Sequence, residues 1–291
     1  MILVALGGLV VAIWAYLLLG RGFFWSTSLA APAPESAQYP RVVAVIPARN
    51  EAESVGRAVA SLLDQDYPGD FSIVLVDDHS HDATSEVARD AARGREDRLT
   101  IVAARSLPGG WTGKLWALSE GVRQIASQPD LYLFTDADIA HHRTNLRELV
   151  ARLEAEQRDM VSLMVKLHCE SLAEKFLIPP FVFFFALLYP FSWSNNRRRT
   201  TAAAAGGCVL LRRSAYERIG GYAAIRDELI DDCALAAMVK KSGGSIWLGL
   251  TPGTESLRPY PEIADIWNMV ARTAYTQLQY SPLLLAGTVL G

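Results

Sequence analysis

The chain has 291 residues, which is enough for one large domain or two ordinary ones with a substantial core. Its formal charge of -3 and pI near 6.0 argue against a nucleic-acid binder, because such proteins carry a strongly basic face. The three cysteines, Cys169, Cys208 and Cys233, form no CxxC pair, so we expect reduced, buried thiols rather than disulfides or a zinc site.

The first segment, Ile2 to Leu19, has no ionisable side chain except Tyr16. Eighteen helical residues span about 27 Å, close to the hydrocarbon thickness of a bilayer. We therefore predict a transmembrane anchor over residues 1–22. A cleaved signal peptide is the alternative, but the basic residue Arg21 follows the apolar run instead of preceding it. The positive-inside rule, applied to Arg21 and Arg41, predicts a cell inner membrane location with the following domain facing the cytoplasm.

After a Pro- and Ala-rich linker over residues 23–40, apolar runs and helical patterns alternate. This alternation predicts an α/β fold, with a mostly parallel central sheet and helices on both faces. The predicted strands are 41–47, 71–76, 99–103 and 131–134, and the predicted helices between them are 53–64, 83–93 and 115–125.

Three of these strands are followed by polar residues that suit a ligand site. In parallel sheets, ligands bind at the carboxyl ends of the strands, so the three groups are expected to meet at one edge. Each group alone also fits ordinary turn chemistry. The groups are Arg49 with Glu51, Asp77 with Asp78, and Asp136 with Asp138.

The stretch LYLFTDADI, Leu131 to Ile139, is the most informative of the three. Residues i and i+2 at a strand end point to one side, so Asp136 and Asp138 are able to aim at one divalent cation. Two carboxylates leave that cation short of oxygen ligands, and a nucleotide diphosphate would supply more. The alternative is a turn whose aspartates cap a helix.

The second half of the chain predicts strands over 160–167 and 204–212, and helices over 233–241 and 263–278. Gly206 and Gly207 open the strand 204–212, where they either allow a ligand to approach the backbone closely or form a bulge.

Phe176 to Trp193 is rich in phenylalanine and interrupted by prolines, so an interfacial or re-entrant membrane segment is predicted. The run Arg197 to Arg199 would then face anionic headgroups. A buried hairpin followed by a solvated basic loop is the alternative. Residues 281–291 are apolar and suggest the start of a further membrane segment.

Four motifs, in this order and spacing, resemble glycosyltransferase family 2, the inverting GT-A enzymes that use nucleotide-diphosphate sugars. Among its members, the sequence is most similar to hopanoid-biosynthesis-associated glycosyltransferases, with ceramide glucosyltransferase-like enzymes as broader relatives. The motifs are VIPARNE at 45–51, DDHSHDAT at 77–84, GWTGKLWAL at 110–118 and TDAD at 135–138.

This resemblance implies a GT-A fold and a nucleotide-sugar donor, with Mg²⁺ or Mn²⁺ held by Asp136 and Asp138. Lys114 would approach the diphosphate, although a solvated lysine at a helix start is the alternative. A carboxylate suits ribose hydroxyls and a uracil imide, because both are hydrogen-bond donors. The implied donor-binding residues are Pro47, Arg49, Glu51, Asp77, Asp78, Lys114 and Asp136.

The stretch DELIDDCAL at 227–235 resembles the Glu-Asp motif of the same family, with Asp231 in the glutamate position. Asp232 is then the expected general base, with a pKa raised by its acidic surroundings. Alternatively, both aspartates favour the N-terminal dipole of the following helix. The family's Gln-x-x-Arg-Trp signature is not intact, because only Arg272 fits it, so a single transfer per acceptor is expected. Arg272 would help the leaving phosphate or lie on a helix surface.

The motifs and the family resemblance together predict an enzyme, a metal-dependent glycosyltransferase that moves a sugar from a UDP-linked donor to a membrane lipid hydroxyl with inversion. The resemblance alone implies that the lipid belongs to hopanoid biosynthesis. The partners are the donor, a lipid acceptor and the membrane. A polyprenyl-phosphate sugar transferase and an inactive membrane scaffold with the same fold are the alternatives. The expected organisation is an anchor at 1–22, a linker at 23–40, a GT-A domain at 41–280 and the start of a further membrane segment at 281–291. Within the GT-A domain, we expect a donor half at 41–140 and an acceptor half at 141–280, which includes the interfacial segment 176–193.

Overall fold

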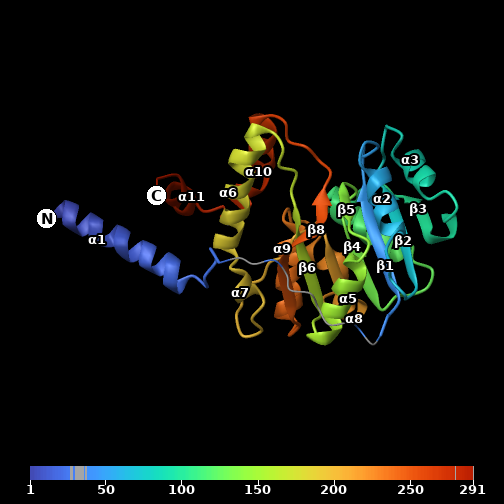
Figure 1. Ribbon diagram of the computed structural model, residues 1–291, viewed down its shortest axis with the longest axis horizontal. Coiled ribbons are helices and arrows are strands. Elements are labelled where there is room, and N and C mark those ends of the chain that lie inside the picture. The colour runs from blue at the N-terminus through green and yellow to red at the C-terminus, as the bar shows by residue number, and fades with distance from the viewer. Residues whose placement is uncertain (27–28, 30–35, 37, 279, 291) are drawn as a thin grey trace.

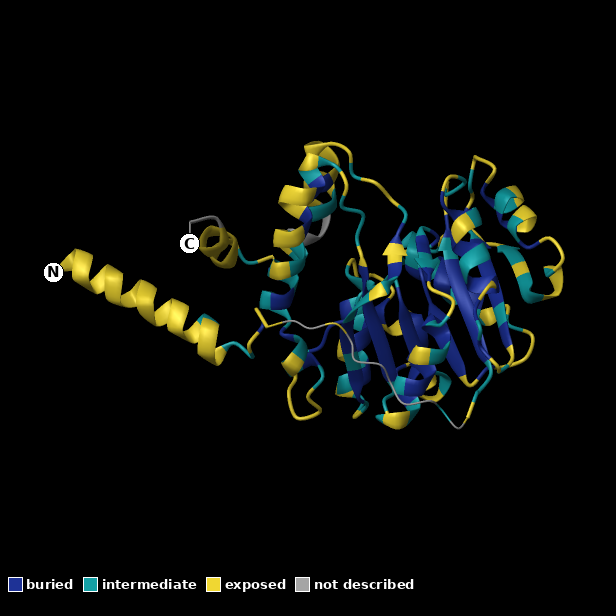
Figure 2. Cartoon of the chain, in the orientation of Figure 1, coloured by how far each residue is buried: buried dark blue, intermediate teal, exposed yellow. Residues whose placement is uncertain are grey.

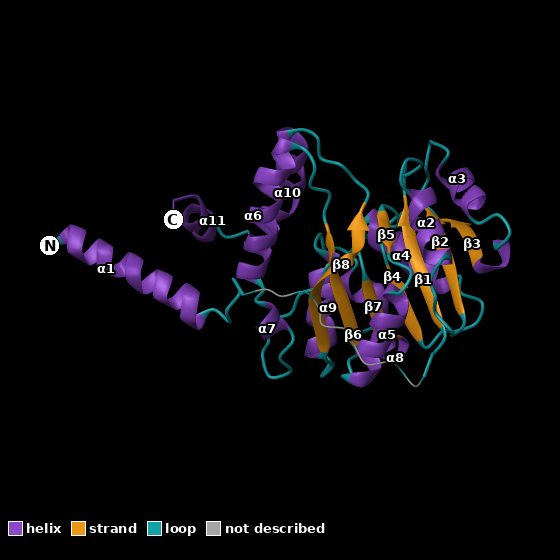
Figure 3. Cartoon of the chain, viewed as in Figure 1, coloured by secondary structure: helices purple, strands orange, loops and turns teal. Residues whose placement is uncertain are grey.

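The computed structural model describes residues 1–26, 29, 36, 38–278 and 280–290, with the side chains of 272–274, 289 and 290 left aside. Its strands are β1 (Val42–Ala48), β2 (Phe71–Asp77), β3 (Leu99–Ala103), β4 (Leu131–Phe134), β5 (Ile139–His141), β6 (Met160–Lys166), β7 (Val209–Arg212) and β8 (Ile246–Ser256). Within these residues, eight strands form one sheet in the order β3-β2-β1-β4-β7-β6-β8-β5 (Figures 1 and 3).

The first half of the sheet is parallel, as predicted. β1 pairs in parallel with β2 and β4, and β2 with β3, so the carboxyl ends of β1, β2 and β4 share one edge. The second half is mixed, because β7 runs antiparallel to both β4 and β6, and β5 runs antiparallel to β8. β8 returns to a parallel pairing with β6.

Helices cover both faces of the sheet, which confirms that part of the prediction. Alternate residues of β1 point to opposite faces: Val42 packs with α2, α3 and α5, whereas Val43 packs with α4, α8 and α9. Figure 2 shows the strands as the buried centre of the domain. The helices are α1 (Ile2–Ala15), α2 (Val55–Leu63), α3 (Thr84–Ala91), α4 (Gly113–Arg123), α5 (Asn145–Ala155), α6 (Leu172–Leu188), α7 (Phe191–Ser194), α8 (Arg213–Arg218), α9 (Asp231–Lys241), α10 (Ile263–Gln277) and α11 (Pro282–Leu290).

Two predicted elements differ from the structure. The strand expected over 204–212 begins only at Val209, because residues 204–208, with their two glycines, form an irregular approach to β7. Two of the prolines in the apolar segment do not break it, because α6 continues through Pro179 and Pro180, whereas the third, Pro190, lies between the end of α6 and the start of α7. In the first turn of α6, Ser171 and Glu174 form a capping box, in which each side chain accepts a hydrogen bond from the backbone N–H of the other residue. These two hydrogen bonds offset part of the cost of Pro179 and Pro180, which have no backbone N–H to donate.

α1 continues through a π-helical turn, Tyr16–Gly20, and projects away from the domain (Figures 1 and 2). Among the described residues, one helical segment, Ile2–Gly20, is long and apolar enough to cross a membrane. It is not buried against the rest of the structure. The predicted linker at 23–40 falls partly outside the described residues. Within it, Phe24 is buried and Leu29 forms an isolated bridge with Leu250.

Glu174 is a fully buried carboxylate that joins α6 to the segment between β8 and α10. It accepts hydrogen bonds from the backbone N–H of Tyr260 (2.7 Å) and Ser171 (2.8 Å) and from His168 Nδ1 (2.7 Å). Burial alone would raise the pKa of Glu174, but these hydrogen bonds hold it well below its usual range. The carboxylate therefore favours folding at neutral pH, and its contribution is lost as the pH falls below the unfolded value of about 4.3.

We expect Glu174→Ala to lower the free energy of unfolding by about 3 kcal/mol, because several buried donors lose a charged acceptor. The corresponding fall in Tm is about 6 °C or more, measured by thermal unfolding of the detergent-solubilised chain. Glu170→Ala is the matched control, because the Glu170 side chain is 85% exposed and we expect it to leave Tm nearly unchanged. Equal losses in the two variants would contradict this assignment.

Candidate functional site

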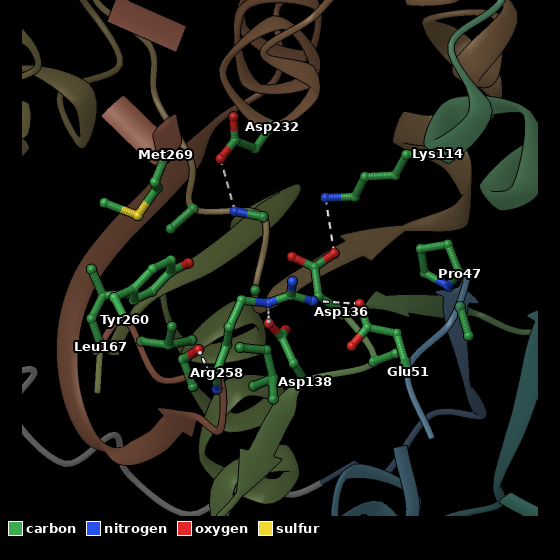
Figure 4. Close-up of a pocket in the computed structure, with 18 of the residues that line it drawn as sticks. Pro47, Glu51, Lys114, Asp136, Asp138, Leu167, Asp232, Arg258, Tyr260 and Met269 are labelled. Carbon is green, nitrogen blue, oxygen red and sulfur yellow. Dashed lines mark hydrogen bonds and ion pairs between the residues drawn. The ribbon is translucent and has the colours of Figure 1, made fainter. Parts of the chain in front are cut away.

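A cavity of about 850 Å³ opens at the shared carboxyl edge of β1, β2 and β4 (Figure 4). The β4 strand end, the turn before β7 and the start of α9 contribute to it together with the loops after β1 and β2. The structure thus gathers residues that are far apart in the sequence. The predicted site residues that line it are Pro47, Arg49, Glu51, Asp78, Lys114, Asp136, Asp138, Gly206, Gly207 and Asp232.

The loops after β1 and β2 hold each other in place. Asn50 and His79 both adopt left-handed backbone conformations, with φ of 54° and 58°. The Asn50 N–H donates to Ser80 Oγ (3.0 Å), and the His81 N–H donates to Asn50 Oδ1 (2.8 Å). The two loops are thereby locked side by side, which brings the Arg49 guanidinium within 3.6 Å of the Asp78 carboxylate at the cavity wall.

Asp77 lies behind this wall, and the described cavity lining does not include it. Its carboxylate accepts from the Ser80 N–H (2.9 Å) and from Ser85 Oγ (2.5 Å). Burial opposes the charge, but these hydrogen bonds lower the pKa of Asp77 overall. Asp77 therefore shapes the turn that presents Asp78.

Lys114, at the start of α4, is ion-paired in the structure. Its Nζ lies 2.8 Å from Asp136 Oδ1 and 3.3 Å from Asp231 Oδ2. Burial alone would lower the pKa of Lys114, but Asp136 and Asp231 raise it, so the ammonium stays charged. Gly206 leaves room for it, because a Cβ there would stand 3.3 Å from Nζ. Burial raises the pKa of Asp136, against the opposing effect of Lys114.

Arg258 completes the floor of the cavity and was not found from the sequence. Its guanidinium bonds Asp138 through Nε (2.8 Å) and also bonds Glu51 (Figure 4). These partners are 120 and 207 residues away in sequence, so no local motif predicts the contact. Arg258 therefore connects the segment after β8 to the ends of β1 and β4.

Asp232 faces the opposite side of the cavity, at the first turn of α9. Its two oxygens accept from the N–H groups of Gly206 (2.8 Å) and Cys233 (2.7 Å). Burial, followed by the charge of Asp231, raises the pKa of Asp232 to about 6, while Lys114 opposes that rise. A carboxylate with this pKa is suited to accept a proton near neutral pH.

Asp231 points to Lys114 and not to the main cavity, so the two adjacent aspartates differ in surroundings. Both lie in the first turn of α9, where they also favour the helix dipole, as the alternative interpretation held. Arg272 belongs to α10, but its side chain lies outside the described part of the chain.

The remaining wall of the cavity is apolar and comes from β6, α6 and α10. It includes Val165, Val182, Phe185 and Met269. Phe185 also packs against a small buried cluster that contains Cys233, the residue next to Asp232. A polar end and an apolar end therefore meet in one cavity, and Asp232 also lines that cavity.

Comparison with known sequences gives one family match. The model of the family described as "Glycosyl transferase family 2" matches residues 43–220, which is more than half of the chain. A beta-monoglucosyldiacylglycerol synthase of Synechocystis sp. is 35% identical over 113 residues, covering 38% of this chain and 22% of that protein. An N-acetylglucosaminyltransferase of Rhizobium meliloti is 29% identical over 133 residues, covering 45% of this chain and 29% of that protein. The chain thus spans less than a third of these relatives.

Comparison with solved structures confirms the predicted GT-A fold. A mannosyltransferase from Pyrobaculum calidifontis, solved with GDP-Man and Mn²⁺, aligns with a TM-score of 0.64 and 22% identity, covering 91% of this chain and 74% of that one. S. aureus TarS 1-349 aligns with a TM-score of 0.52 and 15% identity, covering 83% of this chain and 72% of that one. At these sequence identities, the structural similarity is evidence for the fold alone.

Proposed function

The chain belongs to glycosyltransferase family 2, and on this premise we propose that it transfers a sugar from a nucleotide-diphosphate donor to a hydroxyl of a membrane lipid. One observation carries the proposal. A single cavity contains the cationic and acidic groups of a diphosphate site, a carboxylate whose pKa is raised to about 6, and an apolar wall.

On the donor side, we assign the base and ribose to the edge formed by Pro47, Arg49 and Asp78, where carboxylate and guanidinium offer hydrogen bonds of both polarities. Lys114 is placed to bind the diphosphate, because its charge is fixed by neighbouring aspartates and it lines the cavity. A carboxylate is a suitable acceptor for the imide N–H of uracil, and we propose UDP as the nucleotide.

The carboxylates Asp136 and Asp138 fit a divalent cation. Hard oxygen donors of this kind suit Mg²⁺ and Mn²⁺, which are typically held by one or two carboxylates with substrate phosphates. Among the described residues, no group of three or more His, Cys, Asp or Glu side chains is arranged to hold a metal, so water and the diphosphate of the donor would complete the coordination. When bound, the cation would stabilise the charge of the departing diphosphate.

We assign Asp232 as the general base. Its carboxylate takes the proton from the acceptor hydroxyl while that oxygen forms a bond to the anomeric carbon. The bond from this carbon to the diphosphate breaks on the opposite side, and the diphosphate leaves with the electron pair. This single displacement inverts the anomeric centre. Asp231 acts as a positioning residue through Lys114.

Several observations support a lipid as acceptor. The apolar wall around Val182 and Phe185 suits a lipid, and α1 provides an exposed apolar helix. We propose that α1 anchors the protein in the inner membrane, with the domain in the cytoplasm. A matched relative is named for a glucosylated diacylglycerol. The resemblance of the motifs to hopanoid-associated enzymes makes a hopanoid hydroxyl our first candidate acceptor.

A donor-hydrolysis screen tests this function without knowledge of the lipid. The full chain is incubated with UDP- and GDP-linked sugars, with and without Mn²⁺, and release of nucleoside diphosphate is measured. We expect slow release from one donor class that increases with Mn²⁺. No release from any donor, together with no nucleotide binding, would support the inactive scaffold.

The pKa of Asp232 predicts the pH dependence of this hydrolysis. Because the base must be deprotonated, kcat/KM should rise with pH and level off above about 6. The rise belongs to the free enzyme, since kcat/KM reports groups that titrate before donor binding. A flat profile from about pH 5 to about pH 8 would contradict the role of Asp232.

Arg258 bonds one of the proposed metal ligands, so a cation must compete with its guanidinium. We expect Arg258→Ala to tighten Mn²⁺ binding severalfold in the absence of nucleotide, because the ion pair between Arg258 and Asp138 no longer has to be broken. Electron paramagnetic resonance of free Mn²⁺ measures this directly. Arg57→Ala is the control, because Arg57 pairs only with exposed Glu255 among its described ion-pair partners. Weaker Mn²⁺ binding in Arg258→Ala would show that Arg258 supports the metal site.

A further inference from the structure

A second cavity, of about 440 Å³, lies between α6 and the β6–β8 part of the sheet. We call it the α6 groove. Its walls are almost entirely apolar, and Lys166 is the charged residue among the described ones that line it. Four residues line both the groove and the reaction cavity, so the two are adjacent: Met164, Val165, Leu167 and Val182.

The end of α1 is fixed against the same groove. Arg21 donates to the carbonyl oxygens of Leu187 (3.1 Å) and Leu188 (3.2 Å) at the end of α6. Phe24, only 4% exposed, packs edge-on against Phe183 of α6 with ring centroids 5.2 Å apart. The residues that follow α1 therefore contribute to the groove, since Phe24 and Trp25 line it. The exposed apolar helix α1 projects from the part of the molecule where α6 lies (Figures 1 and 2).

We propose that the α6 groove holds a hydrocarbon chain of the acceptor lipid while the hydroxyl-bearing head enters the reaction cavity beside Asp232. The inference rests on the proposed function, because it assigns the tail subsite of that acceptor. The walls shared by the two cavities supply a continuous apolar path from the groove to the reaction cavity.

The chemistry of the groove favours a hydrocarbon chain over a peptide. A peptide segment carries backbone N–H and C=O groups that must be paired when buried. The described lining offers few polar side chains to pair them, namely those of Lys166, Cys169 and Trp25. A hydrocarbon chain needs no such partners and gains affinity from burial, about fourfold for each methylene removed from water.

The test uses the full chain in phosphatidylcholine nanodiscs that contain a photoreactive acceptor lipid: a hopanoid alcohol that carries a diazirine in one sample, and a diacylglycerol with a diazirine in its acyl chain in another. After photolysis, cross-linked peptides are mapped by mass spectrometry. We expect adducts on the residues facing the groove, such as Met164, Ile178 and Val182. Adducts confined to α1 and to the outward side of α6, for example at Phe176, would show bulk membrane contact only and overturn the proposal.

Two substitutions test whether the adducts depend on access to the α6 groove. Cys169→Trp places a large side chain in the groove and should reduce groove adducts at least fivefold. Phe176→Trp is the matched control, because Phe176 is 75% exposed on α6 and lines neither described cavity; its adduct pattern should match the wild type. Undiminished groove adducts in Cys169→Trp would overturn the proposal, and the wild-type map decides it if this variant does not fold.

Donor hydrolysis by the same wild-type sample separates this inference from the function on which it rests. Hydrolysis without groove adducts rejects the tail subsite and retains the transferase. Groove adducts without hydrolysis of any donor support a lipid-chain site in a protein whose proposed activity has failed. Adducts together with hydrolysis support both.

Discussion

Asp232→Asn should reduce donor turnover by about 10³-fold at pH 7, within the range of 10² to 10⁴ that general-base catalysis contributes. The amide has nearly the shape of the carboxylate and still has an oxygen to accept the Gly206 N–H, so the turn before β7 is expected to persist. Nucleotide binding should stay within about twofold, because Asp232 lies at the start of α9, away from the Arg49 and Asp78 edge of the cavity.

The measurement compares kcat for nucleoside diphosphate release with the dissociation constant of the nucleotide. Asp227→Asn is the matched control: it removes a carboxylate from the loop before α9, but Asp227 is exposed and lines neither described cavity, so kcat should be unchanged. A near-normal kcat for transfer to lipid in Asp232→Asn would favour the alternative acceptor, a polyprenyl phosphate, because a phosphate oxygen needs little base catalysis.

The sequence predicts well which residues meet at the polar edge of the cavity, because the information is local. Each strand is a short apolar run, and its polar residues follow directly, so the parallel arrangement of β1, β2 and β4 is enough to bring Asp78 and Asp136 to one edge. The different role of Asp77 has no such signal. Adjacent residues at a strand end point to opposite sides, and the turn to Ser85 takes up the Asp77 carboxylate.

Contacts made across the whole fold are what sequence reasoning missed. Arg258 meets Asp138 and Glu51 because β5 and β8 pair antiparallel and return the chain to the carboxyl edge of β1 and β4. The long α6 was missed for another reason. Its prolines argue locally against a helix, whereas the capping box at Ser171 and the hydrogen bonds of buried Glu174 favour it.

Lys114 couples the two ends of the cavity, since its charge acts on Asp136, Asp231 and Asp232 together. Lys114→Met removes a cation that lowers the pKa of Asp232 while leaving the repulsion of Asp231 in place. We therefore expect the rising limb of the kcat/KM profile to move from about pH 6 to higher pH by about one unit or more. Turnover on the plateau should also fall by about 10²-fold, because the diphosphate loses a preorganised positive charge.

The shift in pH, and not the loss of rate, distinguishes this role from simple donor binding. Lys114→Arg keeps the charge, so its rising limb should stay near the wild-type pH even if the larger group crowds Gly206 and lowers kcat. An unshifted limb in Lys114→Met would mean that the ammonium acts on the donor alone. A shifted limb would show that the strand end at Asp136 and the helix start at Asp232 form one electrostatic unit, in which the group that neutralises the leaving diphosphate also sets the basicity of the residue that activates the acceptor.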